Sequence, residues 1–352
     1  MRSRVWLAGA ALAALPSAAW AVAQSPPEAA PTSKSSAGAT EPWWSSAAIG
    51  LGPLEHSSGT PASVFRMGYL PQAPATLLKG QWEVHSHLDW ANFFCDGGER
   101  YFLDYESVRL RLGATYGLTA RTQLGIVGSV SYQGGGILDG FIEGFERAVG
   151  AINRDRLRVP RDRYLVRWRG QDGSSHEITR GEGGWHMDGL ALQVMHQLLA
   201  GSETKPSLVA TGTVRFPIAA HVPGRPEGAV DVGGSLGVGQ RLGRFNLYGG
   251  LGLVLFGSSG EEGADLMRYQ VSVSTALEYR ATPRTSYVVQ SLISGPVARH
   301  MGELSKRVRE VAVGFRHRVG RNVILEASAE ENVLLFSNSA DIAFHGGLIW
   351  RP

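Results

Sequence analysis

The chain reads Trp82-Glu83-Val84-His85-Ser86-His87-Leu88-Asp89-Trp90 where an alternating pattern begins. Charged residues and histidines fill the odd positions, whereas four of the five even positions are apolar or aromatic. A period of two indicates a β-strand whose two faces meet different environments, one polar and one apolar. We therefore predict a strand here, with its ionisable side chains together on one face.

The same alternation recurs along the rest of the chain. We predict twelve strands, at residues 82–90, 107–116, 123–132, 188–198, 207–218, 229–241, 245–257, 267–280, 285–294, 307–319, 322–331 and 340–350. Several alternate over 10 to 13 residues, which exceeds the ~5 to 6 residues usual in soluble strands and approaches the ~9 to 11 that cross a bilayer at a tilt. Short connections alternate with longer ones, as expected for short periplasmic turns and long outer loops.

These patterns predict an all-β fold, an antiparallel transmembrane β-barrel of about 12 strands (12–14) with a long, partly helical extracellular loop. A closed barrel satisfies all backbone N–H and C=O groups without water. Trp82, Trp90, Tyr132, Tyr269, Tyr279 and Trp350 lie near strand ends on the apolar face, where membrane proteins carry interfacial aromatics. A soluble β-sandwich or lipocalin-like barrel is the alternative, and it would turn the apolar face inward.

Composition agrees with this fold class. Of 352 residues, 46 are Gly, 43% are hydrophobic and 18% are charged, with a mean hydropathy of −0.08. The chain is too apolar to be disordered, yet beyond the first 25 residues no run approaches the ~18 apolar residues of a membrane helix. These values exclude a helical membrane protein. The many glycines suit strands whose inner face closely approaches other side chains.

The N-terminal part divides into three predicted segments. Residues 1–23 read as a signal peptide that ends in Ala21-Val22-Ala23, residues 24–41 as a disordered linker, and residues 42–79 as a periplasmic arm that packs locally. The barrel is predicted over residues 80–352. Removal of Arg2 and Arg4 lowers the formal charge from +3 to +1, so charge gives no argument for a nucleic-acid partner. Secretion and the barrel together predict the cell outer membrane.

The segment after the third strand resembles a known family. The run from Gly134 to Phe145 (GGGILDGFIEGF) is similar to the signature of the family called domain of unknown function 3187 of Gram-negative bacteria, as are Gly52-Pro53-Leu54, residues 88–92 (LDWAN) and residues 247–252 (LYGGLG). The signature residues are Gly136, Leu138, Asp139, Phe141, Ile142, Glu143 and Phe145; at the next position the family has a His where this chain has Glu146. The resemblance implies an outer-membrane protein without an established activity.

The long loop at residues 134–187 contains two further features. Apolar residues four apart predict a helix at 137–152, with Asp139 capping its start. Cations follow, and we single out Arg154, Arg156, Arg158, Arg161 and Arg163 as a candidate anion-binding loop for lipopolysaccharide phosphates or an anionic solute. The alternative is a solvated loop whose arginines pair with lumen carboxylates.

The polar face of the first strand is the other candidate site. A simple hairpin register places Arg109 and Arg111 opposite Glu83, His85, His87 and Asp89. Histidines two apart on a strand can bind zinc or transfer protons. Inward faces elsewhere also mix charges, namely Arg215, Arg268, Arg280, Arg316 and Arg318 against Glu278, Glu310, Glu326 and Glu330. We therefore favour an ion-pair network in a polar lumen over a metal site.

No catalytic motif is found, and no cofactor or metal is predicted; Cys95 alone cannot form an intramolecular disulfide, and we expect it in a loop. The favoured function is a channel or transporter for small polar or anionic solutes. The alternatives are an outer-leaflet lipid-modifying enzyme and a structural or surface barrel without a small ligand. The expected partners are outer-membrane lipids and the outer-membrane assembly machinery, for which the strand ending at Trp350 is a candidate signal.

Overall fold

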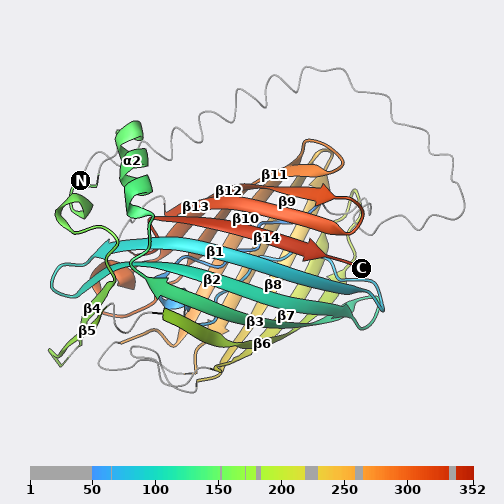
Figure 1. Ribbon diagram of the computed structural model, residues 1–352. Coiled ribbons are helices and arrows are strands. Elements are labelled where there is room, and N and C mark those ends of the chain that lie inside the picture. Colours follow the sequence, from blue (N-terminus) through green and yellow to red (C-terminus); the bar gives the residue numbers. More distant parts are fainter. Residues whose placement is uncertain are drawn as a thin grey trace, which may run out of the picture.

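A computed structural model describes residues 50–64, 66–150, 153–170, 172–179, 184–218, 229–257, 265–332 and 338–352. In this part of the chain, twelve antiparallel strands form a closed barrel (Figure 1). They are β1 (Trp82–Asp96), β2 (Tyr101–Gly117), β3 (Thr122–Gly134), β6 (Gly184–Leu199), β7 (Ser207–Phe216), β8 (Asp231–Leu242), β9 (Phe245–Leu255), β10 (Tyr269–Arg280), β11 (Thr285–Ser294), β12 (Val308–Val319), β13 (Val323–Asn332) and β14 (Ile342–Trp350). The barrel closes because β1 pairs with both β2 and β14. The predicted fold class is confirmed.

The alternation of the sequence separates the outside of the barrel from the inside. On β10, Val271 and Val273 are exposed, whereas Gln270, Ser272 and Ser274 between and beside them are buried. Aromatic pairs stand near both ends of the outer face: Trp82 with Tyr116 at 4.7 Å between ring centroids, and Tyr132 with Trp185 at 5.4 Å. An apolar band between aromatic girdles is the surface of a barrel that spans a membrane. No helix within the described ranges has the length and apolar character needed to cross one.

The two ends of the barrel differ. The short-turn end carries the connections at 118–121, 200–206, 243–244, 281–284 and 320–322, and the C-terminal strand finishes there, on the right in Figure 1. The long-loop end carries helix α2 (Asp139–Val149) and the hairpin of β4 (Leu165–Arg169) and β5 (Ser175–Thr179). The helix lies within the predicted 137–152, but the hairpin, which extends the sheet from β2, was not expected.

Two expectations at the long-loop end were wrong. β1 and β2 extend so far that the connection between them is only 97–100, whereas the predicted strands at 82–90 and 107–116 leave a longer connection. Asp139 does not cap α2: Leu138 is the N-cap residue and makes no side-chain cap bond. The Asp139 carboxylate instead accepts hydrogen bonds from Arg156 and from Asn92 of β1, because a buried guanidinium is the stronger partner for a carboxylate.

An apolar cluster fills the lumen beside β1 and β2 at the long-loop end. Phe93 and Tyr105 stack at 4.6 Å between ring centroids, and Tyr105 meets Tyr164 edge to face at 6.2 Å. Val297, Ala298, Met301 and Leu304 pack against them, the last from the short helix η5 (Gly302–Ser305). Cys95 is fully buried in this cluster on β1, and not in a loop as expected, because its side chain points into the barrel with Phe93.

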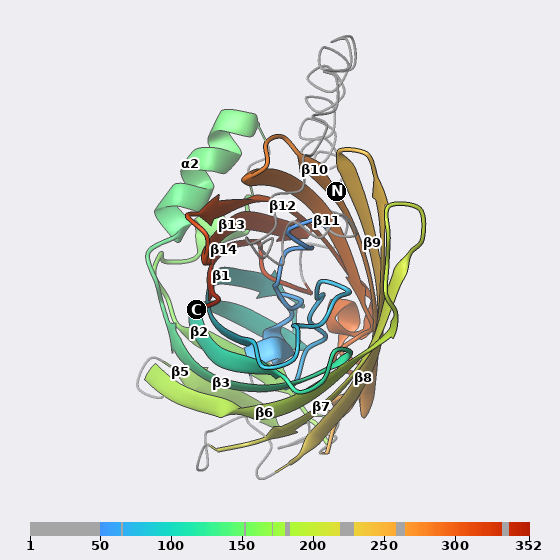
Figure 2. The same ribbon diagram turned by 90° about the vertical axis from the view of Figure 1, so that its right-hand side faces the viewer.

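The N-terminal arm lies inside the barrel. We expected residues 42–79 to pack locally on the periplasmic side, but residues 50–81 run through the lumen and include the short helix η2 (Pro61–Val64) (Figure 2). The arm lies there because buried polar side chains of the inner wall need hydrogen-bond partners. Glu278, Gln290 and Glu310 face inward, and each accepts a backbone N–H of the arm. The predicted signal peptide, the linker and the first residues of the arm lie outside the described residues.

Candidate functional site

The lumen is the candidate functional site, and the arm divides it. We call residues 50–59 the ascending limb, because they run from the short-turn end toward the long-loop end. Leu51 N–H donates to Glu278 at 2.9 Å, and Gly59 N–H donates to Glu310 at 2.8 Å. Between them, Leu54 exchanges two hydrogen bonds with the amide of Gln290, at 3.0 and 3.1 Å. Wall side chains thus satisfy backbone N–H and C=O groups of this extended segment, which in a sheet would bond to a neighbouring strand.

Residues 66–78, the descending limb, return along the opposite wall. Met67 N–H donates to Asp231 at 2.9 Å, and Leu77 N–H donates to the side chain of Gln123 at 2.8 Å. Tyr69 lies over the inner face of β9, where a Cβ on Gly250 or Gly252 would overlap its ring. The glycines of β9 therefore make room for an aromatic side chain, in agreement with the expectation that glycine lies where the inner face closely approaches other side chains.

A cavity of about 790 Å³ lies between the descending limb and the wall formed by β1–β3 and β6–β9. It reaches from the short-turn end, at Gln81 and Gly201, to the level of Asp188, which lies in the third of β6 next to the long-loop end. Its lining mixes apolar and polar side chains, and the charged ones are mostly cationic, with three carboxylates (Glu55, Glu83, Asp188) and six arginines (Arg66, Arg109, Arg111, Arg215, Arg316, Arg351). The cavity is thus a water-compatible space with an excess of positive groups.

The six residues predicted as a lumen polar cluster all face this interior. The predicted register holds, since His87 pairs with Arg111 and Asp89 with Arg109 across β1 and β2. Arg111 Nε lies 3.1 Å from Asp89, whereas Arg109 Nε lies 3.2 Å from Asp188, which was not foreseen. The remaining members have acidic or basic neighbours too: His85 lies 3.9 Å from Glu83, and Glu83 accepts a hydrogen bond from Arg351. The cluster is an ion-pair network.

Glu55 of the arm completes the network. Its carboxylate lies 3.3 Å from Arg316 and 3.4 Å from His87. Burial alone would raise the pKa of Glu55, but the hydrogen bond with His87 and the nearby charges of His87 and Arg316 outweigh burial and hold this pKa well below its usual range. Glu55 is therefore ionised at neutral pH, and it fixes the ascending limb electrostatically to β1 and β12.

Arg316 is the most enclosed cation of the wall, with 1% of its surface exposed. Its Nε donates to Glu326 at 2.6 Å and one Nη donates to the carbonyl of Leu51 at 2.5 Å. Arg316 and Glu326 were among the inward charges expected to pair, and they do. No sequence pattern indicates that an arm carbonyl accepts from the other donor of Arg316, because the arm has no periodicity from which its contacts could be predicted.

The candidate anion-binding loop does not gather into one site. Arg156 is buried and pairs with Asp139 and, at 2.5 Å, with Asp341. Arg161 pairs with Glu143 at 2.5 Å, and its neighbour Arg163 lies over the ring of Phe102 at 5.7 Å. Arg158 pairs with Asp155 at 3.3 Å on the surface, and Arg154 is exposed. The arginines mostly neutralise carboxylates, as in the alternative interpretation, but carboxylates outside the lumen.

The family-signature residues attach the long loop to the outer face of β1 and β2 by hydrogen bonds. Glu106 of β2 accepts hydrogen bonds from Leu138 N–H and, at 2.9 Å, from the indole of Trp90. Gly136 has φ +72°, and a Cβ there would overlap Glu106, so the signature needs glycine at this position. Glu146, which replaces the family's His, accepts the Asn153 N–H at 2.6 Å and holds the chain after α2.

The same signature gives α2 two different faces. Ile142 is buried against the barrel, whereas Phe141 and Phe145 are exposed and stack at 6.4 Å between ring centroids. Phe141 also meets Phe344 of β14 at 5.8 Å, so the helix stands beside the β1–β14 seam, as Figure 1 shows. These contacts are structural, and they assign no chemistry to the signature.

Comparison with solved structures finds barrels of outer-membrane channels that are similar to this one in fold. An outer-membrane channel from Pseudomonas putida F1 matches with a TM-score of 0.52 and 12% identity, over 79% of this chain and 97% of that one. The NanC porin (TM-score 0.43, 7% identity, 76% and 98% coverage) and the toluene transporter of Ralstonia pickettii (TM-score 0.39, 11% identity, 86% and 98% coverage) also match. The likeness to the Pseudomonas putida channel shows the fold.

None of the curated proteins compared with the chain matches it. A family model, in contrast, matches residues 33–351, which include the arm, the signature loop and all strands of the barrel. The chain belongs to the family described as protein of unknown function DUF3187.

Proposed function

We propose that the protein is an outer-membrane channel for small polar solutes, with a preference for anions. The observation that carries the proposal is the cavity of about 790 Å³ within the barrel, which reaches the short-turn end and whose lining includes many hydrogen-bonding and charged groups. Spaces of this size hold small molecules. In barrels of the outer membrane the short turns face the periplasm, so solute would leave the cavity on that side.

The preference for anions follows from how the ion pairs are oriented. Arg111 and Arg215 line the cavity, whereas their partners Asp89 and Asp231 are not part of the lining. Arg316 likewise lines the cavity in front of Glu326. A solute in the cavity therefore meets the guanidinium side of these three pairs, although Glu55, Glu83 and Asp188 line the cavity together with their arginine partners. Planar guanidinium groups bind carboxylates and phosphates well.

The arm and the apolar cluster would restrict passage. The descending limb forms one side of the cavity, and the cluster around Phe93 and Tyr105 fills the β1–β2 side at the long-loop end. A barrel of twelve strands lies between filled eight-stranded barrels and open sixteen-stranded porins. The proposal is thus a narrow channel whose bore depends on the position of the arm.

The outer-leaflet enzyme has less support. That hypothesis needs His85 or His87 near the outer rim, but both face the cavity on the side of the short-turn end, next to Glu83 and Glu55. Their neighbours are carboxylates, which suits the ion-pair network described above. No specific observation favours lipid chemistry.

Planar-bilayer recording tests the channel. The wild-type protein should conduct, and its reversal potential in a KCl gradient should indicate anion preference. Gln193→Glu places a negative charge in the cavity and keeps the size of the side chain. In the wild type the side-chain amide of Gln72 donates to Gln193 at 3.0 Å, and the new carboxylate can accept the same hydrogen bond. We expect this variant to shift the reversal potential toward cations.

The matched control is Gln240→Glu, which adds the same charge on β8 outside the cavity lining. It should leave the reversal potential unchanged. Absence of conductance from folded wild-type protein, combined with no solute uptake into liposomes, would refute the channel. An equal shift in both variants would refute the role of the cavity lining.

A further inference from the structure

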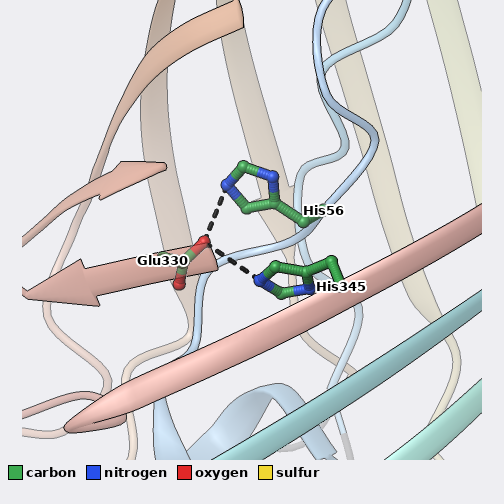
Figure 3. A group of neighbouring side chains, drawn as sticks. All are labelled: His56, Glu330 and His345. Carbon is green, nitrogen blue, oxygen red and sulfur yellow. Dashed lines mark ion pairs between the residues drawn. The ribbon is translucent and has the colours of Figure 1, made fainter. Parts of the chain in front are cut away.

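Three buried side chains meet where the ascending limb crosses the wall. His56 comes from the arm, Glu330 from β13 and His345 from β14, and Figure 3 shows both imidazoles directed at the same carboxylate. His56 Nε2 lies 2.7 Å and His345 Nε2 lies 3.7 Å from Glu330 Oε2. One nitrogen from each histidine and the carboxylate oxygen all lie within 4.8 Å of one another.

A second carboxylate orients His345. Asp89 of β1 lies 2.8 Å from His345 Nδ1, so Nδ1 carries the proton and donates it to Asp89. Nε2, the atom that faces Glu330, is then the nitrogen that would bind a metal ion, with its own proton displaced by that ion. A carboxylate behind the far nitrogen of a histidine is the usual support of a metal-binding imidazole.

The cluster leaves coordinating atoms without hydrogen bonds. Within the described part of the chain, His345 Nε2 and Glu330 Oε2 are fully enclosed and neither makes a hydrogen bond of good geometry. Buried polar atoms are rarely left in this state. Both side chains are more than nine-tenths buried, and His56 is 1% exposed, so bulk water does not solvate them.

The charges around the cluster are a further argument for a bound cation. Glu310 stands beside Glu330 on the inner wall, and a Cβ on Gly59 would lie 3.1 Å from one carboxylate and 3.4 Å from the other. The two histidine rings stack at 4.8 Å between centroids, a distance at which two imidazolium ions would repel each other. The two rings are therefore not both charged, and a divalent cation would supply positive charge beside the two buried carboxylates.

We propose that His56, Glu330 and His345 bind a divalent transition-metal ion, with Zn²⁺ as the best match. Two imidazoles and one carboxylate are ligands that zinc prefers, with water in the fourth position. Zinc bonds of about 2.0–2.2 Å in a tetrahedron place ligand atoms roughly 3.3 Å apart. The distances of 2.7 and 3.7 Å to Glu330 lie on either side of that value, and all three ligand atoms lie within 4.8 Å of one another. Side-chain rotations that draw the two imidazole nitrogens together around the ion would complete the tetrahedron.

The ion would join the arm to the wall. His56 is in the arm, whereas Glu330 and His345 are on adjacent strands of the barrel. A metal ion bound to all three residues would fix the end of the ascending limb that lies toward the long-loop end, next to Gly59 and Glu310. This inference concerns a structural ion and does not depend on whether the barrel conducts solute.

The test is metal content after folding with ZnCl₂. Because the three side chains are buried, the protein is refolded into detergent with and without ZnCl₂, and freed of loose metal by gel filtration. We expect one zinc ion per chain in the wild type, and none above background in His56→Gln or Glu330→Gln. Asp89→Asn should weaken zinc binding about 10- to 100-fold, as for loss of a supporting carboxylate.

The matched control is His85→Gln, which removes another lumen histidine that also has a carboxylate neighbour. It should keep its zinc, and loss of zinc there would overturn the assignment. Wild-type protein that holds no more zinc than His56→Gln would overturn it too. Where a wall variant fails to fold, zinc-edge X-ray absorption of the wild type decides: two imidazole ligands are expected, and a shell of oxygen alone would refute the site.

Discussion

Glu278 is a single residue that shows how the wall and the arm depend on each other. Its side chain is completely buried, and it accepts hydrogen bonds from Tyr248 at 2.5 Å, from Asn246 at 3.3 Å and from Leu51 N–H at 2.9 Å. Among the described residues no cation pairs with it. The carboxylate is therefore held by neutral donors, one of which belongs to the arm.

Glu278→Gln should destabilise the protein. The amide offers one acceptor atom in place of two, so at least one of these buried donors loses its partner, which costs about 1–3 kcal/mol. The free energy of unfolding, measured by tryptophan fluorescence in urea, should fall by that amount. Glu203→Gln is the control, because Glu203 is exposed in a turn, 3.6 Å from Arg241; it should change stability by less than about 0.5 kcal/mol. Equal effects of both substitutions would contradict the argument.

At the scale of elements, the strands could be predicted and the arm could not. Each strand separates an apolar outside from a polar inside, and two environments at fixed spacing produce an alternation that the sequence shows directly. The arm has no such constraint. Its bonds reach residues far along the chain, as from Leu54 to Gln290, and they join backbone atoms to wall side chains. No local sequence pattern indicates that Glu55 pairs with Arg316. The same holds for His56, which lies beside Glu330 and His345.

The helix α2 was predicted from its apolar residues, but its attachment to the loop is electrostatic. Glu143 is held by Arg161 at 2.5 Å and by Arg147 at 3.1 Å. The hydrogen bond with Arg161 lowers the pKa of Glu143, and its effect exceeds the opposing effect of burial. A carboxyl group with a lowered pKa in the folded state contributes stability above its ordinary pKa of about 4.3, and this contribution is lost as the pH falls through the folded value.

The loop after α2 should therefore loosen in acid and not at neutral pH. We expect hydrogen exchange of residues 153–161, corrected for its intrinsic pH dependence, to accelerate at about pH 3 relative to pH 7. Glu143→Gln should show the fast exchange already at pH 7, because the amide carries no charge for Arg161. The exposed Glu177→Gln on β5 serves as the control and should exchange like the wild type. Exchange that is unchanged in Glu143→Gln would disprove this coupling.

For the whole molecule, the arm determines how much of the barrel remains open. The twelve strands alone would enclose a continuous lumen, and the two limbs of the arm take up much of it (Figure 2). Near the short-turn end the limbs touch, since a Cβ on Gly52 would lie 3.0 Å from the Cβ of Ala73. Most of the arm is thus a loop whose two ends lie together, and it can be removed without stretching what remains.

Excision of residues 53–72, with Gly52 joined to Ala73 through two glycines, should widen the channel. The limb ends keep their places, because Leu51 still bonds Glu278 and Leu77 still bonds Gln123. Water can enter the lumen and solvate Gln290 and Asp231, which limits the loss of stability to the lost packing. We expect single-channel conductance several-fold above that of the wild type. Gel migration that changes on heating would confirm that the barrel is folded; a folded variant whose conductance equals that of the wild type would show that the arm does not limit the pore.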